Sequence, residues 1–468
     1  MTTATGSSSR PEVRRPDLET LFSINADGSR NFIHPADVKG RWQLRKHAAF
    51  ALLVVIYAAL PWIEIGGHPS ILIDIPGRAA YLFGATFTNR DFFLVFFLLT
   101  GIGFALFVLT SLFGRVWCGY ACPQTVYLEG VFRKLERLIE GPREQRIRRN
   151  KGPWTREKLL RKTLKHSLFV LLSLAISHVF LAYFIPVREL LDVMRSPPAE
   201  HLTAFLWVMG ITAVITFDMA WFREQTCLIV CPYGRLQSVL IDADTIIIGY
   251  DTKRGEPRGK RGQTPGDCID CYRCVAVCPT GIDIRSGLQM ECVGCANCID
   301  ACDEIMTHVG RKTGLIRYDS KNSFDGKPRR FWRPRVFLYL VLGILGLAVA
   351  GLATANRTSF EANALRSPGL PYTLIEEKIR NLFTLHIQNK TSEPQTYTIE
   401  PASDASSAAP EFVIAQREVR LEPLGDIKVP VFVTVARSAY AGPFQFSLAV
   451  TEASTQTQRR VEVLFRGP

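Results

Sequence analysis

The chain has 468 residues, a formal net charge of +13 at pH 7 and 47% hydrophobic residues. Such a basic chain could bind nucleic acid, but its lysines and arginines flank long apolar segments, which indicates contact with lipid headgroups and excludes nucleic acid as the expected partner. The first forty residues are rich in Thr, Ser, Arg and Pro and contain no apolar run, so they do not look like a cleaved signal peptide. We expect residues 1–45 to form a flexible cytoplasmic tail.

Five stretches are long and apolar enough to cross a bilayer, which takes about 20 residues at a rise of about 1.5 Å each. Four of them lie in residues 46–222 and predict two helical hairpins, and the fifth is a separate span at 336–355. The approximate limits of the first four are 48–65, 92–113, 167–187 and 202–222.

Lysine and arginine are distributed unevenly between the linkers. The linker 114–166 contains fourteen of them, whereas the linkers 66–91 and 188–201 contain two each. Short cytoplasmic loops of membrane proteins carry an excess of positive charge. We therefore expect the N-terminus, the basic loop 114–166 and the segment 223–335 to be cytoplasmic, and residues 356–468 to lie outside.

Two short cysteine motifs follow the ends of the second and fourth predicted spans. Each is a CxxxCP motif, with its cysteines at Cys118 and Cys122 and again at Cys227 and Cys231. On a helix such a pair shares one face, and the proline tends to end or redirect the helix. The four thiols could bind a soft metal such as Cu(I), form a transient disulfide or carry electrons as dithiols. The alternative is that they are small buried packing residues.

Four other side chains in or near the spans have metal-binding chemistry, namely His178, His201, Met209 and Met219. A single histidine or methionine in such a place is more often a packing or helix-end residue than a ligand. Met209, Met219 and Met306 form no MxxM motif, so the sequence identifies no copper site among them.

Two runs of four cysteines carry the clearest chemical signal. In each run three cysteines recur at intervals of three residues, and a fourth follows after a longer gap. This spacing is the ligand pattern of a two-cluster [4Fe–4S] ferredoxin, in which the fourth cysteine of each run binds the cluster of the other run. We therefore expect one cluster on Cys268, Cys271, Cys274 and Cys302, and the other on Cys292, Cys295, Cys298 and Cys278.

A pair of zinc sites built from CxxC pairs is the alternative. Zinc sites seldom use three evenly spaced cysteines followed by Cys-Pro, which favours clusters. Cys278 is followed by Pro279, whereas Cys302 is followed by Asp303, so the second run departs from soluble ferredoxins at its end. Clusters assemble on free thiolates, which indicates a reducing compartment and agrees with the cytoplasmic side predicted for the segment.

From about Arg357 the hydrophobic pattern changes to an alternation that is typical of β-strands. We expect an antiparallel β-sandwich of about 100 residues within 356–468. It contains no cysteine, and it would serve either as a binding or docking module or as a passive cap on the membrane domain. The alternating residues are Phe383, Leu385 and Ile387; Val429, Val431, Val433 and Val435; Phe444, Phe446, Leu448 and Val450; and Val461, Val463 and Phe465.

Five segments share distinctive motifs with one protein family. They are 113–120 (FGRVWCGY), 250–259 (YDTKRGEPRG), 281–289 (GIDIRSGLQ), 298–303 (CIDACD) and 314–318 (GLIRY). On these motifs the chain resembles the CcoG/FixG/RdxA family of cytochrome c oxidase accessory proteins. The resemblance extends over roughly residues 30 to 468 and includes the aspartate after the last cluster cysteine.

The resemblance implies a polytopic α-helical membrane protein of the bacterial inner membrane, with a cytoplasmic 2[4Fe–4S] ferredoxin-like segment and a periplasmic C-terminal Ig-like β-sandwich. It implies a role in the biogenesis of cbb3-type cytochrome c oxidase, by reducing Cu(II) to Cu(I) for delivery to the oxidase or its copper chaperones. The eight cluster cysteines and the two CxxxCP pairs would be the functional residues, and a cytoplasmic donor would supply the electrons.

Two other functions stay open. Membrane electron carriers of the NapH/NosR type oxidise quinol and share ferredoxin runs and CxxxCP pairs. A non-redox assembly scaffold would use its clusters only to fold the segment 223–335. Reduction of Cu(II) by the purified protein separates the first function from both alternatives.

Overall fold

The structure is a computed structural model that divides into two compact units. The first unit consists of residues 1–72 and 97–348, and the second of residues 73–96 and 349–468. The first contains most of the helices and both cysteine runs, and the second contains a β-sandwich. The residues that the structure describes are 32–88, 91–259, 265–355, 358–367, 370–391, 393–402 and 409–468.

Helix α1 (Arg41–Ala59) begins inside the predicted flexible tail 1–45. The Asp300 carboxylate accepts hydrogen bonds from the backbone N–H groups of Trp42 (3.3 Å) and Gln43 (2.8 Å), so a distant residue caps this helix. The predicted tail is therefore too long at its end, because a contact far along the chain orders it. Residues 1–31 lie outside the described residues.

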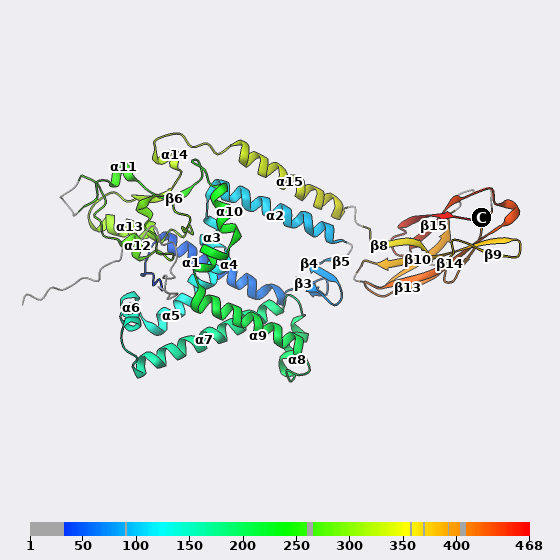
Figure 1. Ribbon diagram of the computed structural model, residues 1–468, viewed down its shortest axis with the longest axis horizontal. Coiled ribbons are helices and arrows are strands. Elements are labelled where there is room, and N and C mark those ends of the chain that lie inside the picture. The colour runs from blue at the N-terminus through cyan, green and yellow to red at the C-terminus, as the bar shows by residue number, and fades with distance from the viewer. Residues whose placement is uncertain are drawn as a thin grey trace, which may run out of the picture. The chain divides into compact units, whose positions relative to one another are not determined.

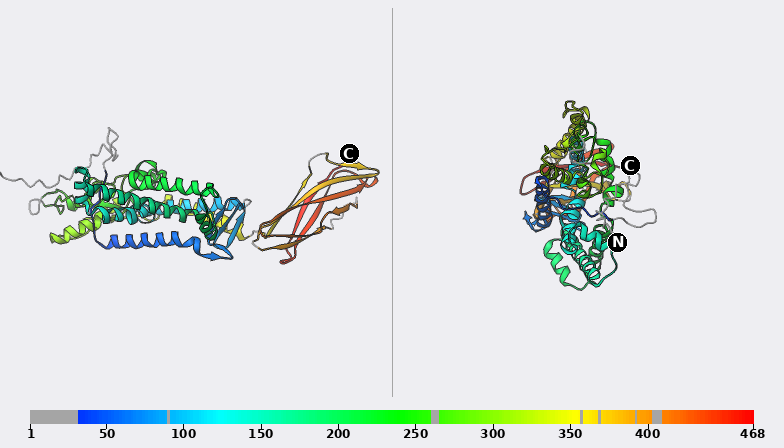
Figure 2. Two further views of the ribbon diagram at one scale, coloured as in Figure 1. Left: turned by 90° about the horizontal axis from the view of Figure 1, so that it is seen from below. Right: turned by 90° about the vertical axis from the view of Figure 1, so that its left-hand side faces the viewer.

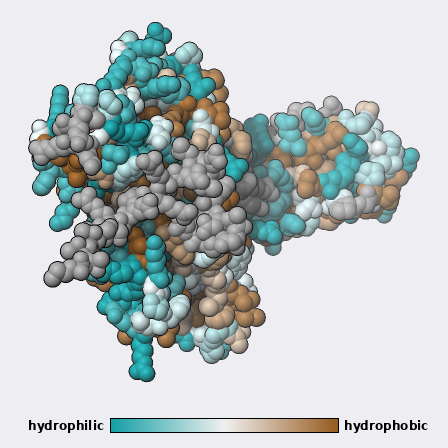
Figure 3. All heavy atoms as spheres, turned by 60° about the vertical axis from the view of Figure 1, so that its left-hand side comes forward, coloured by the Kyte–Doolittle hydropathy of each residue, from teal (hydrophilic) through white to brown (hydrophobic). Residues whose placement is uncertain are grey.

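Five helices in the described part of the chain are long and apolar enough to span a membrane, as predicted. Many large apolar side chains on them are exposed, and apolar surface is visible on the helical unit in Figure 3. In a membrane this surface faces lipid. The helices are α1 with η1 (Leu60–Trp62), α2 (Phe92–Phe113), α7 (Arg156–Leu181), α9 (Leu202–Phe217) with the π-helix η4 (Asp218–Phe222), and α15 (Pro334–Ala355).

The basic linker is helical rather than an open loop, and α7 starts eleven residues earlier than the predicted limit of 167. Thr155 caps α7 by accepting from the Lys158 N–H (3.2 Å), and Lys165 in its third turn pairs with Glu140 (3.1 Å). These partners stabilise polar helical turns that hydropathy assigns to a loop. The remaining helices of the linker are α3 (Val116–Tyr120), α4 (Pro123–Tyr127), the π-helix η3 (Leu128–Phe132), α5 (Arg133–Glu140) and α6 (Arg143–Lys151).

Small residues let the membrane helices pack closely. On α7 and α9 the Thr212 hydroxyl donates to the buried Ser177 hydroxyl (3.0 Å). A Cβ added at Gly101 of α2 would lie 2.7 Å from Leu347 of α15. Close approach at glycine and hydroxyl residues is the usual way in which membrane helices associate.

A buried group of charges joins the linker helices to the end of the fourth span. Glu136 of α5 accepts from Arg223 (3.1 Å) and lies 3.5 Å from Lys165, and all three side chains are almost fully buried. The neighbouring cations hold the pKa of Glu136 well below its usual range although burial opposes this. The ionised network therefore fixes residue 223 and the CxxxCP motif that follows it.

The segment with the two cysteine runs lies at one end of the membrane helices (Figures 1 and 2). Strands β6 and β7 pair antiparallel, with Ile248 opposite Tyr318, and their apolar side chains share a core with α13. The elements are α10 (Pro232–Leu240), β6 (Ile247–Tyr250), α11 (Thr252–Gly255), α12 (Arg273–Ala276), η6 (Ile284–Ser286), α13 (Asn297–His308), β7 (Ile316–Asp319) and α14 (Lys321–Phe324).

The linkers on the other side of the spans also contain structure. The linker 66–91 contains strands, and the linker after α7 contains a helix. The first predicted span ends early at η1, where Pro61 interrupts the helix, so that Glu64 lies in a strand. The strands are β1 (Glu64–Ile65), β2 (His68–Pro69), β3 (Ile71–Asp74), β4 (Ala79–Leu82) and β5 (Ala85–Thr88), and the helix is α8 (Val187–Arg195).

The second unit contains the predicted β-sandwich. One sheet has the strand order β12-β14-β10-β8 with β9 beside β10, and the other has the order β13-β11-β15-β16. The predicted alternating residues are buried in its core, except that Phe444 is half-buried. The strands are β8 (Phe360–Arg366), β9 (Thr373–Ile375), β10 (Lys378–Asn389), β11 (Gln395–Pro401), β12 (Glu411–Ile414), β13 (Glu418–Leu421), β14 (Asp426–Ala436), β15 (Phe444–Glu452) and β16 (Gln458–Phe465).

Candidate functional site

Four cysteines line a cavity of about 360 Å³, which we call the first cysteine cavity. Three of them come from the first cysteine run, and the fourth comes from α13 in the second run. Apolar residues of β6, β7 and α13 close the rest of the wall. The cysteines are Cys268, Cys271, Cys274 and Cys302.

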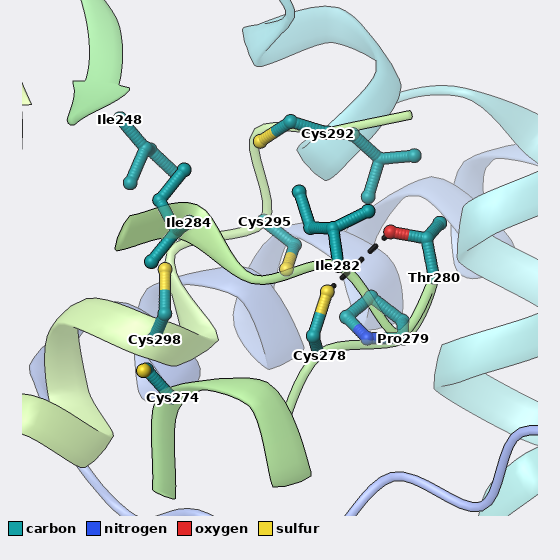
Figure 4. A pocket seen from close by; sticks show the side chains of 11 residues that line it. Ile248, Cys274, Cys278, Pro279, Thr280, Ile282, Ile284, Cys292, Cys295 and Cys298 are labelled. Atoms are coloured by element: carbon teal, nitrogen blue, oxygen red, sulfur yellow. Dashed lines mark hydrogen bonds between the residues drawn. The ribbon is translucent and has the colours of Figure 1, made fainter. Parts of the chain in front are cut away.

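The second cysteine cavity has a volume of about 330 Å³. One of its four cysteines comes from the first cysteine run and three come from the second. Figure 4 shows the side chains of its four cysteines around one space, with Cys274 of the first cavity at the edge and the Cys278 thiol 3.4 Å from the Thr280 hydroxyl. The spacing of the sequence predicts these two sets of four, and the structure brings each set together. The cysteines of the second cavity are Cys278, Cys292, Cys295 and Cys298.

The backbone takes the same path in both runs. The residues on either side of the second cysteine are left-handed: Asp270 (φ 54°) and Tyr272 (φ 55°) in the first run, and Gly294 (φ 68°) and Ala296 (φ 61°) in the second. Such strained positions are found where a function requires them. They turn the chain around the second cysteine and start a short helix that carries the third one, so that three thiols converge on one cavity.

The donor set of both cavities fits an iron–sulfur cluster. All twelve cysteines are free, and burial raises the pKa of Cys292 to about 12 and that of Cys295 to about 11. A metal must displace these protons to bind thiolate. Three evenly spaced cysteines followed by a fourth after a longer gap are typical of clusters and unusual for zinc sites. Four thiols spread around a cavity suit a larger inorganic group.

A buried ammonium group adjoins the second cysteine cavity. Lys46 of α1 is 1% exposed, and its Nζ donates to Asn297 Oδ1 (2.5 Å). Asn297 lies between Cys295 and Cys298 in the chain and donates in turn to the Val277 carbonyl (3.3 Å). No ion pair involves Lys46 in the described part of the chain. Its charge therefore acts on the thiols of this cavity, Cys295 above all.

A second cation approaches the same cavity from the first CxxxCP motif. Arg115, just before α3, donates to the backbone carbonyls of Met290 and Cys292 and to that of Gly234 (2.8 Å). Its bonds go to neutral carbonyls, so its positive charge is retained beside the cavity.

The first cysteine cavity has a different charge balance. Two arginines line it: Arg285 pairs with Asp283 (2.6 Å) and Asp270 (2.6 Å), and Arg273 lies 3.9 Å from Glu304. Asp303 adds a further negative charge close to Cys302. Both arginines of the first cavity thus have carboxylate partners, whereas the described residues provide no such partner for Lys46 or Arg115 beside the second cavity.

Each CxxxCP motif spans the junction between two helices. Cys118 lies within α3 and Cys227 within the π-helix η5 (Thr226–Val230), whereas Cys122 and Cys231 are extended residues directly before the next helix. The expectation that both cysteines of a pair share one helix face is therefore wrong. The proline redirects the chain as predicted, because it occupies the first position of the following helix and its ring fits there.

The two CxxxCP motifs, far apart in the sequence, meet at one place. Cys227 interacts electrostatically with all three other thiols, and Gln237 of α10 donates to the Cys118 sulfur (3.4 Å) across the two motifs. Burial raises the pKa of Cys118 to about 11 and also raises the pKa of Cys122. Burial raises the pKa of Cys227 as well, so these three thiols hold their protons until a metal displaces them.

The CxxxCP thiols adjoin the second cysteine cavity through α3. A Cβ added at Gly119, the residue after Cys118, would lie 2.6 Å from the Gly294 carbonyl. A Cβ added at Gly294 would in turn lie 2.8 Å from the Arg115 carbonyl. Glycine at both positions lets the backbone of the first motif lie against that of the second cysteine run.

A larger cavity of about 890 Å³, which we call the interhelical cavity, adjoins the same motifs. It lies between α4, α7, α9, η4 and η5, and most of its lining is apolar. Its polar groups are the Tyr127 hydroxyl, the Gln124 amide and the Asp218 carboxylate, which accepts from the Thr226 hydroxyl. The π-helices η4 and η5 line this cavity, and π-helical turns often occur at functional sites.

The structure also places the predicted helper residues. Met219 lines the interhelical cavity, whereas His178, His201 and Met209 line another cavity at the far end of α7 and α9. Sequence reasoning missed Lys46 and Arg115, because nothing in their local sequence shows that they approach cysteines far along the chain.

Three family models match the chain. A 4Fe-4S dicluster domain matches residues 222–321, a 4Fe-4S binding domain matches 94–142, and the Ig-like fold at the C-terminus of FixG matches 350–468. The first match contains both cysteine runs, and the second contains Cys118 and Cys122. The chain is therefore an iron–sulfur protein with a C-terminal Ig-like domain.

Named relatives extend the similarity to almost the whole chain. The chain is 39% identical to protein RdxA of Cereibacter sphaeroides over 79% of its length and 82% of the relative's. It is 32% identical to the nitrogen fixation protein FixG of Rhizobium meliloti, with 97% of each covered. The ferredoxin-type protein NapH of Haemophilus influenzae is 25% identical over 44% of this chain and 66% of its own.

A solved structure matches one part of the chain. The crystal structure of a FixG-related protein from Vibrio parahaemolyticus covers 24% of this chain and 97% of its own, with 17% identity and a TM-score of 0.20.

Replacing Lys46 with methionine removes the buried charge and keeps an unbranched side chain. We expect the reduction potential of one cluster to fall by about 70 mV, since a unit charge about 10 Å away at an effective dielectric constant of about 20 contributes about 1.7 kcal/mol. An EPR-monitored redox titration of the purified chain measures the shift. Lys46→Arg should keep the potential, and Arg41→Gln, an exposed change on the same helix, is the control. Equal shifts in both clusters would contradict the placement of Lys46.

Proposed function

Because this chain belongs to the FixG/RdxA family of membrane iron–sulfur proteins, we propose that it reduces Cu(II) to Cu(I) during the biogenesis of a cbb3-type haem–copper oxidase. The observation that carries the proposal is the meeting of the two CxxxCP motifs at Cys118 and Gln237, next to the contact of Gly119 with Gly294 of the second cysteine run. Thiolate sulfur favours Cu(I) among the first-row metals. Electrons would come from a cytoplasmic donor, and Cu(I) would pass to the oxidase or its copper chaperones.

The residues of the chain have separate tasks in this reaction. The clusters, when bound, supply one-electron reducing equivalents, and Cu(II) takes up one electron to become Cu(I). The thiols hold the metal: Cys118, with a pKa of about 11, loses its proton on binding copper. The contact between Gly119 and Gly294 keeps the path from the second cysteine cavity short.

The proposed sidedness has the cysteine runs in the cytoplasm and residues 356–468 in the periplasm of a bacterial inner membrane. Its support is the positive charge of the linker 114–166, whose side chains gather next to the cysteine-run segment. Alkaline phosphatase fused after residue 468 should be active, because this enzyme folds only in an oxidising compartment. The same fusion in the linker 114–166 should be inactive, and the reverse pattern would overturn the sidedness.

The double variant Cys118→Ser, Cys122→Ser tests the copper reaction. The chain is reduced, freed of excess reductant and mixed with Cu(II), and a Cu(I)-specific chelator reports the product. We expect the rate to fall at least about tenfold, because hydroxyl oxygen does not favour Cu(I) as thiolate does. The EPR signal and the iron content should not change.

Thr125→Ser, a change in the turn after Cys122, is the matched control for this variant and should reduce Cu(II) at the rate of the parent chain. A full rate in the double variant would remove the first CxxxCP pair from the reaction.

The interhelical cavity favours a second candidate function, the oxidation of a membrane quinol. An apolar cavity with a few polar groups is the usual form of a site for such a molecule. Quinol oxidation releases two electrons and two protons. The two clusters, when bound, can each accept one electron, Asp218 can accept one proton, and the second proton passes to water.

A short-chain quinol added to the oxidised chain distinguishes the two functions. If the chain oxidises quinol, the clusters become reduced, and Tyr127→Phe and Asp218→Asn slow this reduction at least about tenfold through the loss of hydrogen bonding and proton transfer. Stopped-flow absorbance follows the clusters, and Thr216→Val on α9 is the control. Clusters that stay oxidised in excess quinol exclude this function.

A further inference from the structure

A cavity of about 870 Å³ lies between α7, α8 and α9, at the ends of α7 and α9 that are remote from the CxxxCP thiols. Along α9 and η4 the 21 residues of the span separate the two places by about 30 Å, at about 1.5 Å per residue. Side chains of three helical elements and the loop after α8 form its wall. We call it the histidine–methionine cavity after His178, His201, Met194 and Met209, which line it.

The composition of this wall is unusual for the chain. The chain has eight histidines and six methionines in 468 residues, yet two of each line one cavity. Apart from Ser196, its other lining residues are apolar, and none of them is Asp, Glu, Lys, Arg or Cys. The only strong metal donors here are therefore imidazole nitrogen and thioether sulfur.

A hydrogen bond orients the His178 ring so that one of its nitrogens is available to a ligand. Its Nδ1 lies 2.8 Å from the Leu174 carbonyl on the preceding turn of α7. A carbonyl oxygen can only accept, so Nδ1 carries a proton, and in the neutral ring Nε2 then has the lone pair that a metal needs. This bond to a backbone carbonyl is the arrangement that orients metal-binding histidines in general.

We propose that the histidine–methionine cavity binds a copper ion, with His178, His201, Met194 and Met209 as ligands. Hard cations such as Mg²⁺ and Ca²⁺ need carboxylate or carbonyl oxygen, and iron–sulfur clusters need thiolate. Imidazole suits copper and zinc, whereas thioether sulfur selects Cu(I) over zinc. A monovalent ion is also easier to desolvate in an apolar wall than a divalent one.

The flexibility of the two methionines allows the ligands to converge. Met194 on α8 and Met209 on α9 are both about half exposed, at 55% and 46%, so their thioethers can turn into the cavity without breaking the core. Methionine has three rotatable bonds and adapts to irregular spaces. The core beside the cavity is formed by Leu181, Leu190 and Val208, which hold α8 against the two longer helices.

This site stands apart from the proposed reduction of copper. Binding a metal ion moves no electron, and the cavity shares no residue with the CxxxCP group. The site can therefore exist whether or not the chain reduces Cu(II), and an experiment on binding alone separates the two.

The test uses the full chain in detergent with its clusters, in which the CxxxCP cysteines are replaced by serine so that they cannot bind copper. Cu(I) is added anaerobically from a chromophoric chelator, and iron content is followed to show that the clusters stay intact. We expect one Cu(I) per chain. His178→Gln and Met194→Leu should each weaken the binding at least tenfold, and X-ray absorption should show nitrogen and sulfur ligands.

Two controls match these variants on the same helices. His166→Gln on α7 and Met219→Leu in η4 remove a histidine and a methionine from the other end of the spans, and they should leave the affinity unchanged. Met194 is exposed, so Met194→Leu tests the proposal even if His178→Gln does not fold. The proposal fails if no Cu(I) binds, if His178→Gln and Met194→Leu bind it as tightly as the parent, or if Zn²⁺ displaces it.

Discussion

The exchange of one thiol between the two cysteine runs is the contact on which the helical unit depends. Cys278 of the first run completes the second cavity, and Cys302 of the second run completes the first. A cluster in either cavity therefore links both runs, and neither run can fold around a cluster alone. The surface made in this way receives the N-terminus of α1, which Asp300 caps, and the backbone of α3 at Gly294. Cluster assembly and the docking of the membrane helices are thus parts of one folding process.

The charge of a bound cluster also explains why helix α1 has a buried lysine, Lys46. Among the described residues Lys46 is buried with only a neutral amide, Asn297, as its partner. A buried cation without a counter-charge is strongly destabilising. A cluster held by four thiolates is anionic, and in the second cavity it supplies the missing negative charge. The first cavity needs no such cation from the membrane helices, because Arg285 comes from its own segment. The two sites are therefore chemically unequal although their cysteine spacings match.

Local sequence patterns predicted the features that depend on local physics. The spans follow from apolar length, the strands around Phe383 and Val433 from alternation, and the two sets of four thiols from cysteine spacing. What the patterns could not show depends on contacts between distant segments. The early start of α7 needs Glu140 as a partner for Lys165. The meeting of the CxxxCP motifs needs the packing of two hairpins, and the role of Lys46 needs a residue about 250 positions away.

Helices α7 and α9 connect the CxxxCP thiols with the histidine–methionine cavity. Both groups contain donor atoms that suit copper, but their metal binding depends on pH in different ways. Burial raises the pKa of Cys118 to about 11 and also raises the pKa values of Cys122 and Cys227, so these thiols must release protons to bind a metal. The thioether sulfurs of Met194 and Met209 carry no proton to release. Rising pH therefore strengthens the thiol group more than the histidine–methionine cavity. An ion shared between the two would move toward the thiols, the end at which the clusters can supply an electron.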